Sequence, residues 1–408
     1  MKHTIRYILI LSAVLLFGAC ADNKISEFKA VNTTLNINLE GYKGTLSIPL
    51  TVKVINNSGV GGSASAVYEI SNLDNEIVLT NLIPGQYSIS ISGKLTPEEA
   101  KDIFGVESEL LLKANKTGVE VFENTQNIPI VIDLEISTTS ALIFKEIFYA
   151  GSNYFDGVKS VTYFYEQFYE IYNNSDEVVY LDSLCISNVY PTSGVPLAFD
   201  PSLDDYVFGQ SVWMIPGTGK DVPLDPGKSI VIAQSGRNHK EVFETLLDLS
   251  SADYEAYVEK LDGSAPLDYP VPNLIPAYWV QVSTVKQWLT GVMGNGMVIY
   301  KLDYPFDAND TAKPLNTTVK TLYVKIPKSA IIDAVDCLRD DSKYGEKRFP
   351  ASMDAGYATV SAMYNGKSIA RKILQHMPDG RIIFQDTNNS TDDFEVMDKP
   401  QIKRYLNN

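Results

Sequence analysis

The chain has 408 residues, with 50 acidic and 34 basic side chains, a formal net charge of -16 and a hydrophobic content of 45%. This hydrophobic content is normal for a folded protein and excludes a chain that is disordered throughout. The excess of negative charge repels phosphate backbones and argues against nucleic-acid binding. The 24 tyrosines favour strands over helices, so we expect a mainly β protein.

Residues 1–19 have the features of a lipoprotein signal peptide. Lys2 and Arg6 precede an apolar run that is too short to be read as a membrane-spanning helix. The stretch LFGAC, which ends at Cys20, resembles a bacterial lipobox, in which the Cys thiol takes the lipid. Cys20 then begins a polar tether over residues 20–30 and is held at a membrane by acyl chains. A plain signal peptide is the alternative.

Residues 31–137 predict a first β-sandwich domain, because short apolar alternations recur between turn signals. Thr96 is followed by Pro97 and, three residues after the cap, by Glu99, which predicts a short capped helix through about Phe104. The stretch LIPGQYSISI at 82–91 resembles a corner of transthyretin-like and carboxypeptidase-regulatory-like modules. That resemblance implies a transthyretin-like, immunoglobulin-like sandwich.

Residues 138–408 predict a second β-sandwich. The stretch QFYEIYNNSDEVVYLDSLCIS at 167–187 alternates around a polar turn, which predicts a hairpin of two strands. Together with LDPGKSIVIA at 224–233 it resembles the lamin-tail domain, whose fold is an immunoglobulin-like sandwich. Ser183 and Leu184 stand where that family often has Gly-Trp, so its usual aromatic plug is absent.

We expect this second domain to carry helical and loop insertions at about 190–220 and 235–296, including a helix from Asn238 to Leu247. With the lipobox and the first domain, the whole chain resembles an uncharacterised family of Bacteroidetes lipoproteins.

The remaining thiols and imidazoles offer little chemistry. Cys185 and Cys337 lie in apolar, strand-like settings, so we favour buried free thiols over a disulfide. His239 and His376 are far apart in the sequence and lack the neighbours of a zinc or serine-hydrolase site. We therefore expect both histidines at the surface, no catalytic residues and no cofactor.

Two groups of residues are candidates for binding. The tryptophans lie in or beside the expected insertions and predict an exposed aromatic patch, formed by Trp213, Trp279 and Trp288. A second group offers oxygen ligands at alternate positions, as a Ca²⁺ loop does, and consists of Asp386, Asn388, Ser390 and Asp392. Thr391 stands where an EF-hand loop needs Gly, so we favour a hydrogen-bonded turn, with a Ca²⁺ site as the alternative.

The sequence therefore predicts a non-catalytic lipoprotein, anchored in the outer membrane on either its periplasmic or its cell-surface side, that binds a ligand or a partner protein. The resemblance to Bacteroidetes lipoproteins implies a TonB-dependent outer-membrane transporter as that partner. A glycan-binding module that uses the three tryptophans is the first alternative, and a hydrolase is the second.

Overall fold

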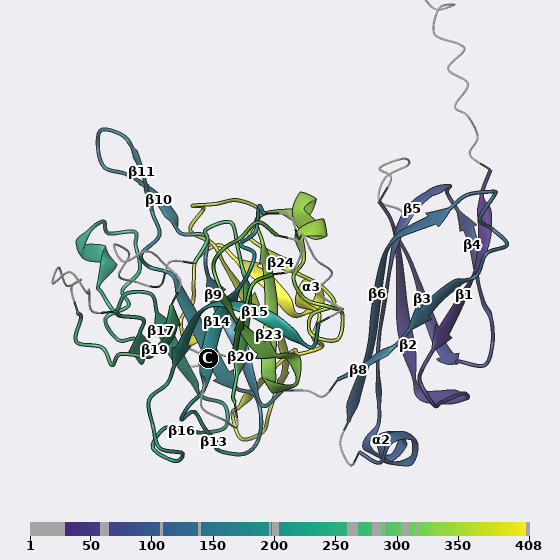
Figure 1. The fold of residues 1–408 in the computed structure, drawn as a ribbon, viewed down its shortest axis with the longest axis horizontal. Coiled ribbons are helices and arrows are strands. Elements are labelled where there is room, and N and C mark those ends of the chain that lie inside the picture. The colour runs from purple at the N-terminus through teal and green to yellow at the C-terminus, as the bar shows by residue number, and fades with distance from the viewer. Residues whose placement is uncertain are drawn as a thin grey trace, which may run out of the picture.

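The computed structural model describes residues 29–57, 65–106, 109–137, 140–195, 197, 204–258, 268–279, 288, 290–302, 310–314 and 317–404. These residues form two β lobes that lie side by side (Figure 1). The expected signal peptide and Cys20 lie outside the described residues, as does nearly all of the tether. None of the helices within the described ranges is long and apolar enough to cross a membrane.

The first lobe packs a five-stranded sheet, in the order β3-β2-β5-β6-β8, against a three-stranded sheet, in the order β4-β1-β7. One face of each strand supplies the core, as Val52 and Val54 of β2 do, because side chains alternate along a strand. The strands are Val31–Asn38 (β1), Thr45–Asn56 (β2), Ser65–Asn72 (β3), Ile77–Leu82 (β4), Gly85–Leu95 (β5), Leu110–Val121 (β6), Ile130–Asp133 (β7) and Glu135–Ser137 (β8).

The expected helix of the first lobe is confirmed as α2, Pro97–Phe104. The Thr96 hydroxyl accepts a hydrogen bond from the Glu99 amide, and the Glu99 carboxylate accepts one from the Thr96 amide. Gly105 ends the helix with a φ of 72°, a left-handed conformation that glycine adopts without strain.

The second lobe packs a six-stranded sheet against an eight-stranded sheet, and apolar side chains from both sheets share one core. The six-stranded sheet contains, in order, Tyr254–Glu255 (β18), Ser229–Ala233 (β17), Phe168–Asn173 (β12), Leu142–Phe148 (β9), Ser368–Arg371 (β25) and Phe394–Met397 (β28). The eight-stranded sheet contains Thr311–Ala312 (β21), Tyr323–Pro327 (β22), Tyr206–Met214 (β15), Cys185–Val189 (β14), Gly296–Tyr300 (β20), Ile331–Leu338 (β23) and Ala358–Thr359 (β24), with Ile275–Trp279 (β19) paired to β15.

Short elements complete the second lobe. Three strand pairs are Ser152–Phe155 (β10) with Ser160–Tyr163 (β11), Val179–Tyr180 (β13) with Pro223–Leu224 (β16), and Ile373–His376 (β26) with Ile382–Phe384 (β27). Helical turns are His239–Glu241 (η1), Lys328–Ala330 (η3), Asp341–Glu346 (η4) and Ser390–Asp393 (α3). The expectation of a mainly β protein built from sandwich domains is confirmed.

The prediction of a two-stranded hairpin at 167–187 is wrong. Strand β12 pairs with β9 and β17 in the six-stranded sheet, whereas β14 pairs with β15 and β20 in the eight-stranded sheet. The polar turn does reverse the chain, and the Asn173 side chain accepts a hydrogen bond from the Ser175 amide. The segment therefore crosses from one sheet to the other and joins the two layers.

The first expected insertion, at about 190–220, is largely part of the sandwich. Its strand β15 pairs with β14, β19 and β22, so it is a central strand of the eight-stranded sheet. The two remaining thiols are free and buried, Cys185 in one apolar cluster and Cys337 in another.

His239 is fully buried, so its expected place at the surface is wrong, whereas His376 is exposed at the end of β26. The helix expected from Asn238 to Leu247 is reduced to the three-residue turn η1. The Tyr163 hydroxyl lies 2.7 Å from Nδ1 of His239, and the Ser235 carbonyl oxygen lies 3.2 Å from Nε2. Because a carbonyl can only accept, the neutral ring carries its proton on Nε2. Burial lowers the pKa of His239 to about 4.

We predict that His239 makes the fold sensitive to acid. Its pKa is lowered from 6.5 to about 4 in the folded state, so its contribution is complete above pH 6.5 and is lost as the pH falls toward 4. The loss should reach roughly 3 kcal/mol of unfolding free energy. Urea unfolding of His239→Gln between pH 7 and pH 4 should therefore show a shallower decline than that of the wild type.

The matched control is His376→Gln, which removes an exposed imidazole and should follow the wild-type pH dependence. The same slope for all three proteins would contradict the assignment of acid sensitivity to His239.

Candidate functional site

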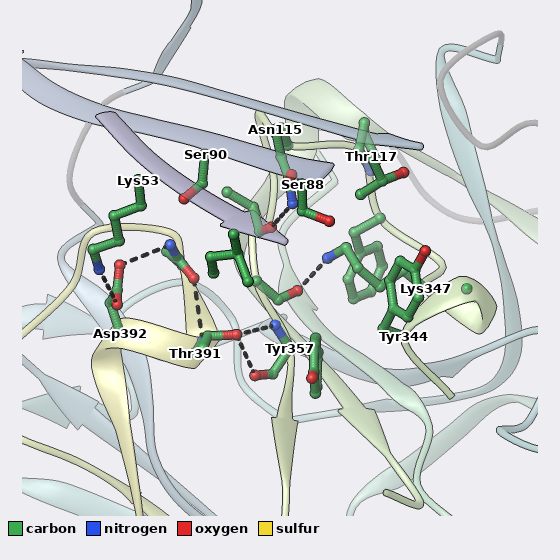
Figure 2. Close-up of a pocket in the computed structure, with 18 of the residues that line it drawn as sticks. Lys53, Ser88, Ser90, Asn115, Thr117, Tyr344, Lys347, Tyr357, Thr391 and Asp392 are labelled. Atoms are coloured by element: carbon green, nitrogen blue, oxygen red, sulfur yellow. Dashed lines mark hydrogen bonds and ion pairs between the residues drawn. The ribbon is translucent and has the colours of Figure 1, made fainter. Parts of the chain in front are cut away.

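A cleft of about 790 Å³ lies between the two lobes, a size within the usual range of small-molecule sites. Strands β2, β5 and β6 of the first lobe form one wall, and loops around η4 and α3 of the second lobe form the other (Figure 2). The described residues that line it include Lys53, Ile55, Asn57, Ser88, Ser90, Asn115, Thr117, Glu135, Asp341, Tyr344, Lys347, Phe349, Gly356, Tyr357, Asn389, Thr391 and Asp392.

The first wall is the outer face of the five-stranded sheet. Lys53 is the register partner of Ser90, and Ser90 is the partner of Asn115, so these three side chains form a row across neighbouring strands. Ile55 and Ser88 are partners in the next row. The residues between these positions face the core of the lobe, since successive side chains point to opposite faces. The wall is therefore a polar platform on a rigid sheet.

The second wall carries the aromatic side chains. Tyr344 lies in η4 and is 41% exposed. The Tyr357 hydroxyl donates to Oδ1 of Asp341 at 3.2 Å. Burial, together with the Asp341 charge, raises the pKa of Tyr357 to about 12, so the phenol stays protonated at neutral pH.

Close contacts between two loops shape the floor of this wall. The Tyr357 amide donates to Oγ1 of Thr391 at 3.0 Å, and that hydroxyl donates to the Tyr357 carbonyl at 2.9 Å. A Cβ on Gly356 would collide with Oδ1 of Asn389 and would lie 2.6 Å from the Thr391 nitrogen. Only glycine lets the two loops approach this closely.

In the described part of the chain, two polar contacts link the lobes across the cleft. Nζ of Lys53 lies 2.7 Å from Oδ1 of Asp392, and Nδ2 of Asn115 donates to the Ala355 carbonyl at 2.7 Å. Figure 2 shows the Lys53 pair at one end of the group of labelled side chains. Both links end on the loops that form the floor, so they set the distance between the walls.

A buried charge cluster underlies the second wall. The Arg371 guanidinium forms ion pairs with Asp333 at 2.9 Å, Asp386 at 3.1 Å and Asp393 at 3.3 Å. Burial raises the pKa of Asp333 above its usual range, although Arg371 opposes this shift. Asp393 also accepts from the Asn389 amide at 3.2 Å, so the cluster fixes the turn that carries the cleft residues.

Lys113 of β6 faces this acidic cluster from the first lobe. Its side chain is buried, and desolvation lowers its pKa to about 8, while Asp386, Asp393 and Asp354 favour its charged form. The lobes therefore meet where a buried cation of one faces an excess of carboxylates of the other.

The predicted aromatic patch is wrong for two of its three members. Trp213 and Trp288 are buried in the core of the second lobe with their ring centroids 6.2 Å apart. Nε1 of Trp288 donates to Oδ1 of Asn188, which satisfies the indole in the core. Both rings belong to the same apolar cluster as Leu184. Trp279 belongs to β19, where it pairs with Ser211.

The four candidate Ca²⁺ ligands bond to different protein partners. Asp386 pairs with Arg371, and Asp392 pairs with Lys53. The Ser390 hydroxyl donates to Asp354 at 2.7 Å, and the Asn388 carbonyl accepts from the Ala355 amide at 2.7 Å. The segment is a hydrogen-bonded turn that ends in α3. Across the described ranges, no group of three or more His, Cys, Asp or Glu side chains could hold a metal ion.

The sequence analysis did not predict the cleft. Its first wall does leave a signal, because the stretch YSISIS of β5 places serine at every second position and apolar residues between them. Such a strand has one polar face, but the sequence does not say what covers that face. The second wall comes from residues about 250 to 300 positions away, which no local pattern connects to β5.

Comparison with known proteins finds a protein family and solved structures to which this chain is similar. A family described as "Protein of unknown function (DUF4876)" matches residues 225–401. The crystal structure of a DUF4876 family protein from Bacteroides thetaiotaomicron VPI-5482 is similar at 29% sequence identity and a TM-score of 0.56, and the match covers 90% of this chain and 94% of that one. These matches confirm the expected resemblance to an uncharacterised Bacteroidetes family. The transthyretin-like and lamin-tail-like assignments stay predictions.

A second solved structure, an adhesin candidate from Bacteroides ovatus ATCC 8483, matches at 12% identity and a TM-score of 0.20, over 61% of this chain and 96% of that one. A similarity this low carries no argument about fold or function. None of the curated proteins matches the chain.

We predict that Gly356→Ala disrupts the floor of the cleft. The added methyl group collides with Asn389 and with the backbone at Thr391, and overpacking of this kind costs about 1–3 kcal/mol. Chemical denaturation should show the loss as a lower midpoint for the variant.

Gly345→Ala is the matched control, because Gly345 also lines the cleft but an added methyl group there would have no neighbouring atom within 4 Å. Equal midpoints for the two variants would refute the close approach at Gly356.

Proposed function

We propose that this chain is a non-catalytic lipoprotein, anchored in the outer membrane through Cys20, that binds a ligand in the cleft between its two lobes. The observation that carries this proposal is the cleft itself. It has ligand size, one wall on a rigid sheet, and a second wall held in place by a buried charge cluster. A site built in this way is pre-organised, which lowers the cost of ordering it when a ligand binds.

The bonding of the ionisable groups in the cleft supports binding rather than catalysis. Lys53 pairs with Asp392, Nζ of Lys347 donates to the carbonyls of Asp354 and Gly356, and Asp341 accepts from Tyr357. These groups hold the walls together. A general base or nucleophile needs a free position beside a reacting atom, and these bonded groups do not offer one.

The membrane anchor and the transporter partner rest on sequence resemblance. The lipobox ending at Cys20 supports the anchor. The lipoprotein resemblance supports a TonB-dependent transporter as the partner, and a pull-down from solubilised membranes that recovers no transporter would remove that partner from the proposal.

We predict that Cys20 carries the lipid. When cells that express the full chain are labelled with palmitate, the wild-type protein should become labelled and Cys20→Ser should not. Cys185→Ser is the matched control and should keep the label, since that thiol is buried in the second lobe. Labelling of Cys20→Ser at the wild-type level would refute the anchor.

We predict that a bulky side chain at Thr117 blocks the cleft. Thr117 is an exposed position of β6 that lines the cleft, so Thr117→Trp should fold and should fill the space between the walls. Native mass spectrometry of full chain purified from membranes should show a retained small molecule on the wild type and none on Thr117→Trp.

Thr80→Trp is the matched control, because Thr80 is an exposed position of β4 on the other sheet of the first lobe. It should retain the same mass as the wild type. Equal retention by Thr117→Trp and Thr80→Trp would place binding outside the cleft.

A further inference from the structure

The charges in the cleft disfavour an anionic ligand. The described residues that line it include three carboxylates and two ammonium groups. The carboxylates belong to Glu135, Asp341 and Asp392, and the ammonium groups belong to Lys53 and Lys347. Both ammonium groups are engaged, Lys53 by Asp392 and Lys347 by two backbone carbonyls. A phosphate, sulfate or carboxylate would meet net negative charge without an available cation.

Two buried acceptor atoms of the lining have no hydrogen-bond partner among the described residues, namely Oδ1 of Asn115 and Oε2 of Glu135. Asn115 donates its Nδ2 to the Ala355 carbonyl, and this bond fixes the amide with Oδ1 as its remaining acceptor. A buried acceptor without a partner destabilises the protein, and a ligand that supplies hydroxyl donors relieves that cost.

The platform around these acceptors extends across neighbouring strands. Ser90 lies beside Asn115 in the row that begins at Lys53, and Thr117 lies two residues farther along β6. Since neighbouring strands are about 4.8 Å apart, a row across three strands spans roughly 10 Å. This length suits a ligand with hydroxyl groups at several ring positions, such as two linked sugar rings.

The opposite wall supplies an aromatic surface. Tyr344 is 41% exposed and lies on the side of the cleft away from the polar platform (Figure 2). Ile55, which is 38% exposed, adds apolar surface to the first wall. A sugar ring offers C–H groups on its faces and hydroxyl groups at its edge, so it can contact an aromatic ring and a row of polar side chains at once.

We infer that the ligand of the cleft is a neutral carbohydrate, with Tyr344 contacting a sugar face and Asn115 and Glu135 accepting hydrogen bonds from sugar hydroxyls. This inference rests on the proposed function, because it names the class of ligand that the cleft binds. It replaces the three tryptophans with a different set of residues as the basis for glycan binding.

The test is affinity electrophoresis of the full chain in gels that contain xylan, mixed-linkage glucan, mannan or starch. At least one of these neutral polysaccharides should retard the wild type. Tyr344→Ala should weaken that retardation roughly 10-fold in apparent Kd, because the aromatic face is lost. Tyr344→Phe keeps the ring and should stay close to the wild type.

Tyr165→Ala is the matched control, because Tyr165 is 39% exposed and lies outside the cleft lining. It should be retarded as the wild type is. No retardation in any of the four gels, equal retardation of Tyr344→Ala and Tyr165→Ala, or calorimetric binding of spermidine or an acidic polysaccharide in place of the neutral ones would each overturn the inference.

The two proposals fail in different ways. A retained molecule that is lost from Thr117→Trp but is not a sugar leaves binding in the cleft intact and overturns the carbohydrate assignment. Retention that Thr117→Trp leaves unchanged overturns both.

Discussion

The buried guanidinium of Arg371 is the constraint on which the second lobe and the cleft both depend. It donates to the Phe144 carbonyl of β9 in one sheet and to Asp333 of β23 in the other, so a single side chain ties the two layers together. It also pairs with Asp386 and Asp393, which flank the turn that lines the cleft. A buried charge is stabilised only while its partners stay in place, and removal of one partner typically costs about 3–5 kcal/mol. The core of the lobe and the wall of the cleft are therefore held by the same group.

The same cluster influences how the lobes meet. It contains more carboxylates than the one guanidinium neutralises. The first lobe places the buried Lys113 ammonium opposite this cluster, and Lys53 pairs with the neighbouring Asp392. These contacts are polar and ionic, unlike the apolar clusters inside each lobe. Contacts of this kind hold an orientation without filling the space between the lobes with apolar side chains, so a hydrated cleft can persist beside them.

Sequence reasoning predicted an element correctly where one of its faces is exposed to solvent. It failed where both faces are buried. Strand β1 and most of β5 in the first lobe alternate between buried and more exposed residues, and the Thr96 capping box marks α2, because local residues decide both features. In the second lobe all residues of β9 and β12 are buried. The β26–β27 pair covers part of the outer face of that sheet through Ile382 and Phe384. The alternation of residues near Glu170 therefore does not indicate a solvent-exposed face.

The misassigned residues share one physical cause. Trp213, Trp288 and His239 lie in stretches without a clear period, and their burial depends on neighbours that are distant in the sequence, such as Tyr169 for Trp288 and Tyr163 for His239. The cleft is harder still to predict, since each wall is an ordinary surface until the other lobe covers it. Only the register of β2, β5 and β6 and the turn around Thr391, seen together, show a site.

A crystal structure of the full chain grown with a soluble oligosaccharide from whichever neutral polysaccharide it binds would test the central claim most directly. We predict density for a sugar between the row of Lys53, Ser90 and Asn115 and the ring of Tyr344, with the Arg371 cluster unchanged. A sugar bound elsewhere on the chain, with the cleft holding only water, would contradict the account.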